Sequence, residues 1–260
     1  GLGDVYKRQY IERVITMESK YIIKIDKLSK SYKQKDALKD ISLNIFRGSV
    51  TGLFGENGAG KTTLMKLLTN QIKADKGSIV INGSPLIFNS KVNAQIGCLL
   101  EKPPLYPYLT AEQHLSLFKT LKYDGQDLST KELIEVYDLT KFKDVKAKEY
   151  SLGMSQRLGL AIAELSCDDI LILDEPFNGL DPVSVNRLRE RILTLKNKGV
   201  TIILSSHLIR ELENVIDNLI IISQGRLLDS ISIDDFMNGK DTSLEHEILK
   251  IMEGQNGELI

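Results

Sequence analysis

The stretch Gly55-Glu56-Asn57-Gly58-Ala59-Gly60-Lys61-Thr62-Thr63 decides which fold we expect for this chain. It fits the spacing G-x-x-x-x-G-K-[ST]; the strand-like residues 50–54 precede it, and the leucine-rich, helix-compatible residues 64–68 follow it. A strand, a glycine-rich loop and a helix start in this order predict a phosphate-binding loop. Glycines let successive backbone N–H groups point at an anion, and the helix N-terminus adds a partial positive charge.

Two side chains of this loop have specific expected roles. We expect Lys61 to reach the β- and γ-phosphates of a nucleotide, and the Thr62 hydroxyl to occupy one position around Mg²⁺. The alternative is a glycine-rich turn with a chance lysine, which the flanking strand and helix disfavour. The expected nucleotide-binding residues of the loop are Gly55, Asn57, Gly58, Gly60, Lys61, Thr62 and Thr63.

Composition narrows the class of protein. The chain has 260 residues, of which 42% are apolar and 27% charged, as in an ordinary globular protein with a sizeable core. The net charge of −1 gives no basic field that would indicate nucleic acid as a partner. Cys98 and Cys167 have no metal-ligand spacing and suggest no disulfide framework, which fits a reducing cytosol. No apolar run approaches the length of a membrane span, so a membrane part would have to come from another chain.

The first residues do not resemble the rest of the chain. Residues 4–9 look like a translated sequencing-adaptor sequence, and we expect the genuine start at Met17. A real N-terminal extension is the alternative. Residues 1–16 are therefore left out of the fold prediction.

Hydrophobic patterns on both sides of the loop predict an α/β fold. Alternation at residues 23–26 and 41–45, with a turn-bounded strand at 77–83, predicts an antiparallel sheet beside the loop. The fully apolar run at residues 170–173 is typical of a buried parallel strand, and residues 201–204 and 219–222 are expected to form two more buried strands.

Helices are expected between these strands. Three prolines within residues 102–107 predict a loop, and Thr110 to Gln113 forms a capping box that opens a helix. The chain then reads as mostly helical to about residue 165, with polar breaks near 124–129, so we expect a helical insertion at about 103–160. Another helix is expected to begin at Asp181-Pro182 and to end at Gly199.

A second group of candidate site residues follows two of the apolar strands. Asp174, at the carboxyl end of the 170–173 strand, is expected to hold Mg²⁺, and Glu175 to orient and deprotonate the attacking water. A surface turn is the alternative for this acidic pair. His207, after the 201–204 strand, could donate to a γ-phosphate, although alone it would be a structural histidine. His114 and His246, in predicted polar helical surroundings, are given no role.

The residues Tyr150-Ser151-Leu152-Gly153-Met154-Ser155-Gln156-Arg157 complete a resemblance. Over about residues 21–230, the chain resembles the nucleotide-binding subunits of ATP-binding-cassette (ABC) transporters. Residues 150–157, here called the signature segment, are similar to the family's Leu-Ser-Gly-Gly-Gln, with Ser151 and Gly153 matching, Leu152 replacing the first glycine and Met154 at the glutamine position. The resemblance implies that this segment binds the γ-phosphate held by the opposite subunit. A plain helix cap is the alternative.

Three further residues take expected roles from the resemblance. Tyr32 matches the aromatic residue that stacks on adenine, with an exposed tyrosine as the alternative. Asp181 matches the loop that crosses the dimer interface, although it could equally be only a helix N-cap. His207 matches the family's switch histidine. Lys61, Glu175 and His207 are thus the expected catalytic residues.

One position departs from the family pattern. Glu101 stands where the family usually has glutamine, after the strand at residues 96–100. A carboxylate there can still bind Mg²⁺ or its water, but it adds negative charge beside the phosphates. In this respect the chain resembles the subgroup that exports, or confers immunity to, lantibiotics and bacitracin-like peptides. Tolerated drift at this position is the alternative.

The resemblance implies a complete organisation. It implies a P-loop NTPase core with an N-terminal antiparallel β subdomain and an inserted helical subdomain, forming an ABC ATP-binding domain at residues 17–230, followed by a C-terminal extension at 231–260. It also implies ATP and Mg²⁺ as cofactors, a second ATPase subunit in a homodimer or heterodimer, and a separate permease that holds the protein at the cytoplasmic face of the membrane. The implied function is an ATPase that powers export of peptide antibiotics or multidrug efflux.

Two other functions stay open. One is a soluble ABC ATPase that acts on ribosomes or DNA. Ribosome-acting members usually carry two cassettes, and repair members carry long coiled coils or zinc sites, whereas this chain has one set of motifs with about 90 residues between Lys61 and Ser151. The other is an importer ATPase, against which Glu101 argues mildly.

Overall fold

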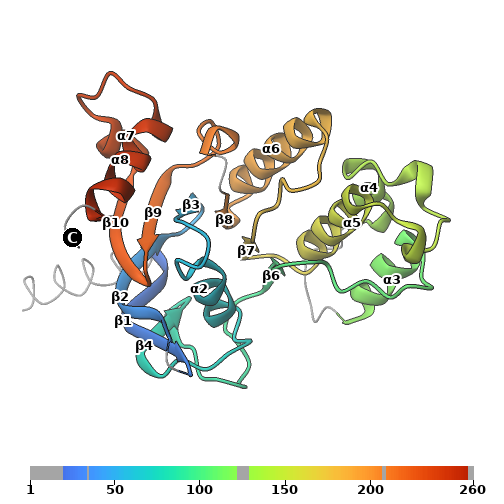
Figure 1. The fold of residues 1–260 in the computed structure, drawn as a ribbon. Coiled ribbons are helices and arrows are strands. Elements are labelled where there is room, and N and C mark those ends of the chain that lie inside the picture. The colour runs from blue at the N-terminus through green and yellow to red at the C-terminus, as the bar shows by residue number, and fades with distance from the viewer. Residues whose placement is uncertain (1–19, 34, 122–128, 207–208, 257–260) are drawn as a thin grey trace, which may run out of the picture.

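The computed structural model describes residues 20–33, 35–121, 129–206 and 209–256, and it arranges them around two sheets (Figure 1). The first sheet has the strand order β2-β1-β4-β5 and is antiparallel throughout. Its strands are β1 (Tyr21–Tyr32), β2 (Lys35–Phe46), β4 (Lys76–Ile81) and β5 (Ser84–Pro85). The antiparallel sheet predicted beside the loop is confirmed.

The second sheet has the strand order β10-β9-β3-β8-β7-β6. Its strands are β10 (Arg226–Ser232), β9 (Asn218–Ser223), β3 (Val50–Phe54), β8 (Thr201–Ser205), β7 (Ile170–Leu173) and β6 (Ile96–Leu99). The strands from β9 to β6 are parallel, as the apolar runs predicted, whereas β10 pairs with β9 in the antiparallel direction. The strand β10 was not predicted.

Both faces of the parallel sheet are buried, which explains why its strands are apolar at most positions. In β7, Ile170 and Ile172 belong to one hydrophobic core, whereas Leu171 and Leu173 belong to the other. The first core also contains Leu64 and other apolar residues of α2 (Lys61–Leu68), together with residues of the antiparallel sheet. The helix that follows the glycine-rich loop is therefore anchored in the core that joins the two sheets.

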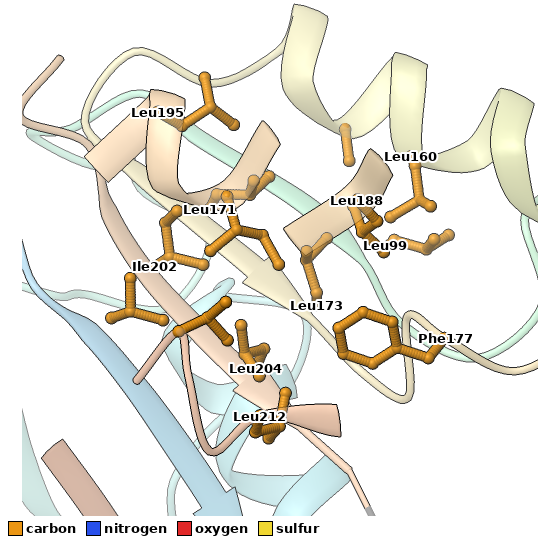
Figure 2. Packing of buried hydrophobic residues seen from close by; sticks show 14 of the residues in the cluster. Leu99, Leu160, Leu171, Leu173, Phe177, Leu188, Leu195, Ile202, Leu204 and Leu212 are labelled. Carbon is orange, nitrogen blue, oxygen red and sulfur yellow. The ribbon is translucent and has the colours of Figure 1, made fainter. Parts of the chain in front are cut away.

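The second core lies under two long helices, α5 (Leu152–Leu165) and α6 (Pro182–Asn197). Figure 2 shows Leu160 of α5 and Leu188 of α6 directed toward Leu171 and Leu173 of the sheet. As predicted, α6 begins after Asp181, which caps it, and the chain turns at Gly199 with φ 89°.

The predicted helical insertion consists of α3 (Ala111–Leu121), α4 (Thr130–Val136) and α5, with short 3₁₀ turns at Thr140–Phe142 and Ala147–Glu149. These helices form a lobe beyond β6 and β7 (Figure 1). The capping box is present, because Thr110 Oγ1 accepts from Gln113 N at 3.3 Å and Gln113 Oε1 accepts from Thr110 N at 2.9 Å. Most of the break predicted near residues 124–129 lies outside the described residues.

The C-terminal residues pack onto this framework. A 3₁₀ turn (Ile209–Glu211) precedes β9, and β10 leads into α7 (Ile233–Met237) and α8 (Leu244–Asn256). Phe236, Leu244 and Ile248 are buried in the second core. The predicted boundary at residue 230 falls within β10 and stays a prediction. Over the described ranges, no helix combines the length and the apolar character needed to cross a membrane.

Candidate functional site

The glycine-rich loop connects the end of β3 to the start of α2, at the carboxyl edge of the parallel sheet. Gly55 has φ 154° and Gly60 has φ 117°. A Cβ atom on Gly55 would lie 2.2 Å from the Ile222 carbonyl oxygen, and one on Gly60 would lie 2.5 Å from the Ala37 carbonyl oxygen. Only glycine fits at these two positions, because the backbone passes directly against β9 and β2.

The Lys61 ammonium is held inside the loop. Its Nζ donates to the carbonyl oxygens of Gly55 at 2.6 Å and Glu56 at 3.2 Å, and the residue is 7% exposed. Burial lowers the pKa of Lys61, whereas the nearby carboxylates of Glu175 and Asp174 raise it. The loop therefore places a largely desolvated ammonium group against its own backbone carbonyl oxygens.

The acidic pair meets the loop through Asp174. Thr62 Oγ1 donates to Asp174 Oδ2 at 2.5 Å. Ser205 Oγ donates to Asp174 Oδ1 at 2.5 Å and accepts from the Glu175 backbone N–H at 2.9 Å. This contact follows from the strand order, because β8, which ends at Ser205, lies between β3 and β7.

A hydroxyl and a carboxylate in contact are a donor set that suits Mg²⁺ when phosphate oxygens and water supply the remaining ligands. Thr62 and Asp174 would supply the protein ligands. Among the described residues, no group of three or more His, Cys, Asp or Glu side chains could hold a metal ion.

Most of the predicted site residues line one cavity of about 300 Å³. These residues are Asn57, Gly58, Gly60, Lys61, Thr62, Thr63, Asp174 and Glu175. Glu175 adopts φ 49°, in the left-handed region that a glutamate seldom occupies. Gly55 lies behind the loop, against β9.

Tyr32 and Glu101 do not line this cavity. Tyr32 ends β1, is 46% exposed, and pairs with Lys35, which does line the cavity. Glu101 has φ 59°, and its Oε1 accepts from Lys66 Nζ at 2.6 Å. This hydrogen bond raises the pKa of Lys66, and the lysine offsets the negative charge that Glu101 brings toward the site.

The residues Ser151, Gly153 and Asp181 form a second group, away from the cavity. Ser151 caps α5 by accepting from the Met154 backbone N–H at 3.2 Å, and it is exposed. Asp181 caps α6, and it accepts from the Ser184 backbone N–H at 3.0 Å. Hydrogen bonds from the backbone and hydroxyl of Ser184, followed by Arg157, lower the pKa of Asp181 to about 2. His207 lies outside the described residues.

Four residues beside the loop were not predicted. A second cavity, of about 450 Å³, is bordered by residues 56–59 together with Lys35, Asp36, Lys39 and Gln224. Gln224 belongs to the β9–β10 turn, where the Gly225 N–H donates to the Ala59 carbonyl at 2.9 Å and the Gly225 carbonyl accepts from Lys39 N at 2.7 Å. Ser205 was missed as well, although its position at the end of an apolar strand was a usable signal.

The expectation of polar surroundings was wrong for His114, which is 0% exposed. Its Nε2 accepts from the Tyr106 backbone N–H at 2.9 Å, and its Nδ1 lies 2.8 Å from the Thr110 carbonyl oxygen. A carbonyl can only accept, so Nδ1 carries the proton. His114 thus ties the proline-containing loop to α3. His246, in contrast, is exposed.

Comparison with known proteins identifies the family. Residues 38–178 match the family described as ABC transporter. The uncharacterized ABC transporter ATP-binding protein YcbN of Bacillus subtilis (strain 168) is 40% identical over 227 residues, which cover 85% of this chain and 73% of that protein. The lantibiotic transport ATP-binding protein SrtF of Streptococcus pyogenes is 38% identical, over 80% of this chain and 89% of SrtF. The bacitracin transport ATP-binding protein BcrA of Bacillus licheniformis is 35% identical, over 87% of this chain and 75% of BcrA.

Solved structures with a similar fold also come from ABC transporters. A structure described as the ATP binding subunit of an ABC transporter matches with a TM-score of 0.79 and 30% identity, over 88% of this chain and 99% of that one. The ATP-binding cassette MJ0796, described as a dimer in a post-hydrolysis state bound to ADP and Pi, matches in fold with a TM-score of 0.73 at 22% identity. The match covers 81% of this chain and 98% of the MJ0796 chain. The chain belongs to the ABC transporter family, as an ATP-binding protein and an ATPase with the P-loop fold of that family.

Proposed function

We propose that this chain is the ATP-hydrolysing subunit of an exporter whose permease is a separate chain, and that two such ATPase subunits close head-to-tail on two ATP molecules. One observation carries the proposal. The cavity beside the glycine-rich loop contains Lys61 and Glu175, whereas Ser151 and Asp181 lie outside it on the ends of α5 and α6. Each chain thus presents two different half-sites, and the half-site of one subunit would complete that of the other.

The first half-site holds the nucleotide and cleaves it. The loop amides and Lys61 bind the β- and γ-phosphates, while Tyr32 stacks on the adenine. Thr62 and Asp174 would hold Mg²⁺, with Glu101 as a further candidate ligand of the ion or of its water, and the ion would supply charge neutralisation on the phosphates. Glu175 accepts the proton of the water that attacks the γ-phosphorus, and His207 donates to a γ-phosphate oxygen. The bond from the γ-phosphorus to the β–γ bridging oxygen breaks, and ADP and phosphate are the products.

The second half-site binds the γ-phosphate held by the partner. The Ser151 hydroxyl and the amides of the first turn of α5, including that of Gly153, are suitable anion donors because they lie at the positive end of a helix. Asp181 would contact the partner across the interface. The dimeric state described for MJ0796, a protein of the same fold, supports this arrangement.

The proposed permease contact lies on the helical lobe. Exposed Tyr106 and Tyr108 belong to the proline-containing loop that follows Glu101. Beyond them, Phe118 and Leu121 of α3 line a cavity of about 470 Å³ that also includes residues 91–95. Closure of the dimer would move this lobe and bias the permease between two access states. Such a permease would place the chain at the cytoplasmic face of the membrane.

The proposed cargo comes from two of the relatives. SrtF is named for lantibiotic transport and BcrA for bacitracin transport. Glu101, in place of the family's usual glutamine, supports the same subgroup. Peptide antibiotics are therefore the proposed substrates, with multidrug efflux as the wider class.

The test is the pair of variants Glu175→Gln and Lys61→Ala. Glu175→Gln should retain ATP and pair into a dimer, measured by size-exclusion chromatography with and without ATP, while steady-state ATPase activity falls by at least about 10²-fold. Lys61→Ala should lose ATP affinity and therefore stay unpaired. Wild-type ATPase activity in Glu175→Gln would refute the base assignment, and a Glu175→Gln protein that binds ATP as a monomer would refute the dimer.

A further inference from the structure

We infer that Lys35 is a second cation of the nucleotide site and contacts the phosphate chain of ATP from the β2 side of the cavity. The inference rests on the proposed nucleotide site and deepens it, because neither the phosphate-loop motif nor the family resemblance assigns a role to Lys35. The class of ligand is a polyphosphate anion, and the role is binding rather than chemistry.

Lys35 forms part of the wall of the cavity that contains most of the predicted site residues. It begins β2 and lines the cavity of about 300 Å³ together with Lys61 and residues 57–58. Its Nζ lies 4.0 Å from the position that a Cβ atom on Gly58 would occupy. Gly58 belongs to the glycine-rich loop, whose backbone N–H groups are the proposed phosphate donors. An anion held by this loop is therefore within reach of the Lys35 ammonium group.

The pairing of β1 with β2 places Lys35 beside the proposed adenine-stacking residue. Tyr32 and Lys35 lie directly opposite each other in the register of the two strands. Opposite residues of an antiparallel pair project from the same face of the sheet. Lys35 thus has Tyr32 as its neighbour on the sheet and Gly58 as its neighbour on the loop. A nucleotide with its base on Tyr32 and its phosphates on the loop would therefore pass Lys35.

The charge of Lys35 has no partner, unlike that of two other lysines around the site. Lys66 pairs with Glu101 at 2.6 Å, and Lys30 pairs with Asp75 at 2.9 Å. Within the part of the chain that the structure describes, the Lys35 ammonium group makes no hydrogen bond and no ion pair. It can therefore approach a phosphate oxygen without first breaking another ion pair, and a charge-assisted hydrogen bond to phosphate is among the strong ones.

The charge of the cavity lining supports the same role. Among the described residues that line the cavity, Asp174 and Glu175 carry the negative charges. Lys35 and Lys61 carry the positive ones. Without Lys35, two carboxylates would face one ammonium group, and this excess of negative charge would oppose the entry of a polyphosphate. Lys35 therefore balances the charge of the lining before any metal ion binds.

The test begins with Lys35→Met, which removes the charge and keeps the length of the side chain approximately. We expect the Kd for ATP, measured by competition with a fluorescent ATP analogue, to rise about 5–12-fold, between the loss of an exposed ion pair and that of a charged hydrogen bond. Lys35→Arg keeps the charge and should stay within about twofold of wild type. In steady-state hydrolysis, KM should rise in Lys35→Met while kcat stays within about twofold, because the contact is made equally before and during the reaction.

Lys39→Met is the matched control. Lys39 lies on the same strand and borders the second cavity, of about 450 Å³, but it does not line the cavity that contains Lys61. The substitution changes the net charge by the same amount, so it reproduces any long-range effect of charge on ATP binding. ATP affinity should stay within about twofold of wild type. An equal loss of affinity in Lys39→Met and Lys35→Met would show a general field effect and would refute the contact.

Inorganic tripolyphosphate, used as a competitor of the same analogue, separates contacts to phosphate from contacts to the base. Lys35→Met should weaken tripolyphosphate by the same factor as ATP, because the proposed contact is with the phosphate chain. Tyr32→Ala should weaken ATP and leave tripolyphosphate unchanged, because the competitor has no base. If Lys35→Met weakens ATP but leaves tripolyphosphate unchanged, Lys35 acts on the base or the ribose and the inference is wrong.

The outcomes also separate this inference from the proposed function. If Lys61→Ala binds ATP as tightly as wild type, the glycine-rich loop is not the nucleotide site, and both the proposed function and the inference are wrong. If Lys61→Ala loses ATP whereas Lys35→Met binds ATP and tripolyphosphate as wild type does, the inference alone is wrong.

Discussion

The buried ion pair between Glu164 and Arg191 offers the sharpest test of how the helical lobe is attached. Glu164, on α5, is 1% exposed. Its carboxylate accepts from Tyr137 Oη at 2.8 Å and from Arg191 Nε at 2.9 Å and 3.1 Å, and it also pairs with Arg191 Nη2. Burial and the adjacent carboxylate raise the pKa of Tyr137 well above its ordinary value, so its hydroxyl stays a donor. The cluster joins the end of α4 to α5 and α6.

We expect Arg191→Met to be strongly destabilising. The substitution removes three of the four hydrogen bonds to Glu164 and leaves a carboxylate buried without its counter-charge. Breaking a buried pair in this way costs about 3–5 kcal/mol. For a chain of this size, with about 2–4 °C per kcal/mol, the melting temperature should fall by about 6–20 °C. Tyr137→Phe removes only one hydrogen bond to the charged group and should cost about 1.5–3 kcal/mol.

The assay is urea unfolding followed by circular dichroism, with calorimetry for the melting temperature. Arg187→Met is the matched control, because Arg187 lies on the same helix and pairs with Asp138 at 3.3 Å, but its side chain is 49% exposed. That variant should cost no more than about 1 kcal/mol. The double variant Glu164→Leu/Arg191→Met should recover much of the loss. If Arg191→Met were no more destabilising than Arg187→Met, the buried pair would not attach the lobe.

Two further predictions concern the site. Ser205→Ala removes the hydroxyl that bonds to both Asp174 and the Glu175 N–H, so ATPase activity should fall about 10–100-fold and require more Mg²⁺; an unchanged Mg²⁺ titration would contradict this. The pKa of Asp181 is lowered from 3.8 to about 2, chiefly by the hydrogen bond from the Ser184 N–H. The Asp181 charge therefore contributes its full stabilisation at pH values above the pKa of the unfolded chain, and this stabilisation is lost as the pH falls toward 2. The stability difference between wild type and Asp181→Asn, followed by urea unfolding from pH 6 to 2, should therefore shrink below pH 4, and a constant difference would show that the Asp181 charge does not matter.

Local patterns in the sequence predicted much of the fold. The motif at residues 55–63 follows β3 and includes the first turn of α2, and residues 170–173, 201–204 and 219–222 form buried parallel strands. These signals are strong because both faces of the strands are buried, which leaves nearly every position of these runs apolar. In contrast, β10 was missed, since its residues are mostly half-buried and carry no clear alternation.

The site was only partly predictable, because proximity in space is set by strand order. Asp174 and Thr62 could be expected to meet, as each follows a parallel strand. Sequence could not show that β8 lies between β3 and β7, and therefore that Ser205 would bond to Asp174. His114 was misjudged for a related reason, since its partners are backbone groups of Tyr106 and Thr110, which leave no trace in residue type.

The turn between β9 and β10 has a consequence for biosynthesis. Gly225 hydrogen-bonds to both Ala59 and Lys39, so the glycine-rich loop is braced by residues that the ribosome adds much later. A nascent polypeptide that has emerged only as far as α6 would contain the whole phosphate-binding motif without this brace. Nucleotide binding should therefore begin late in translation. A chaperone bound to the first 200 residues would hold a loop that still lacks its hydrogen bonds to Gly225.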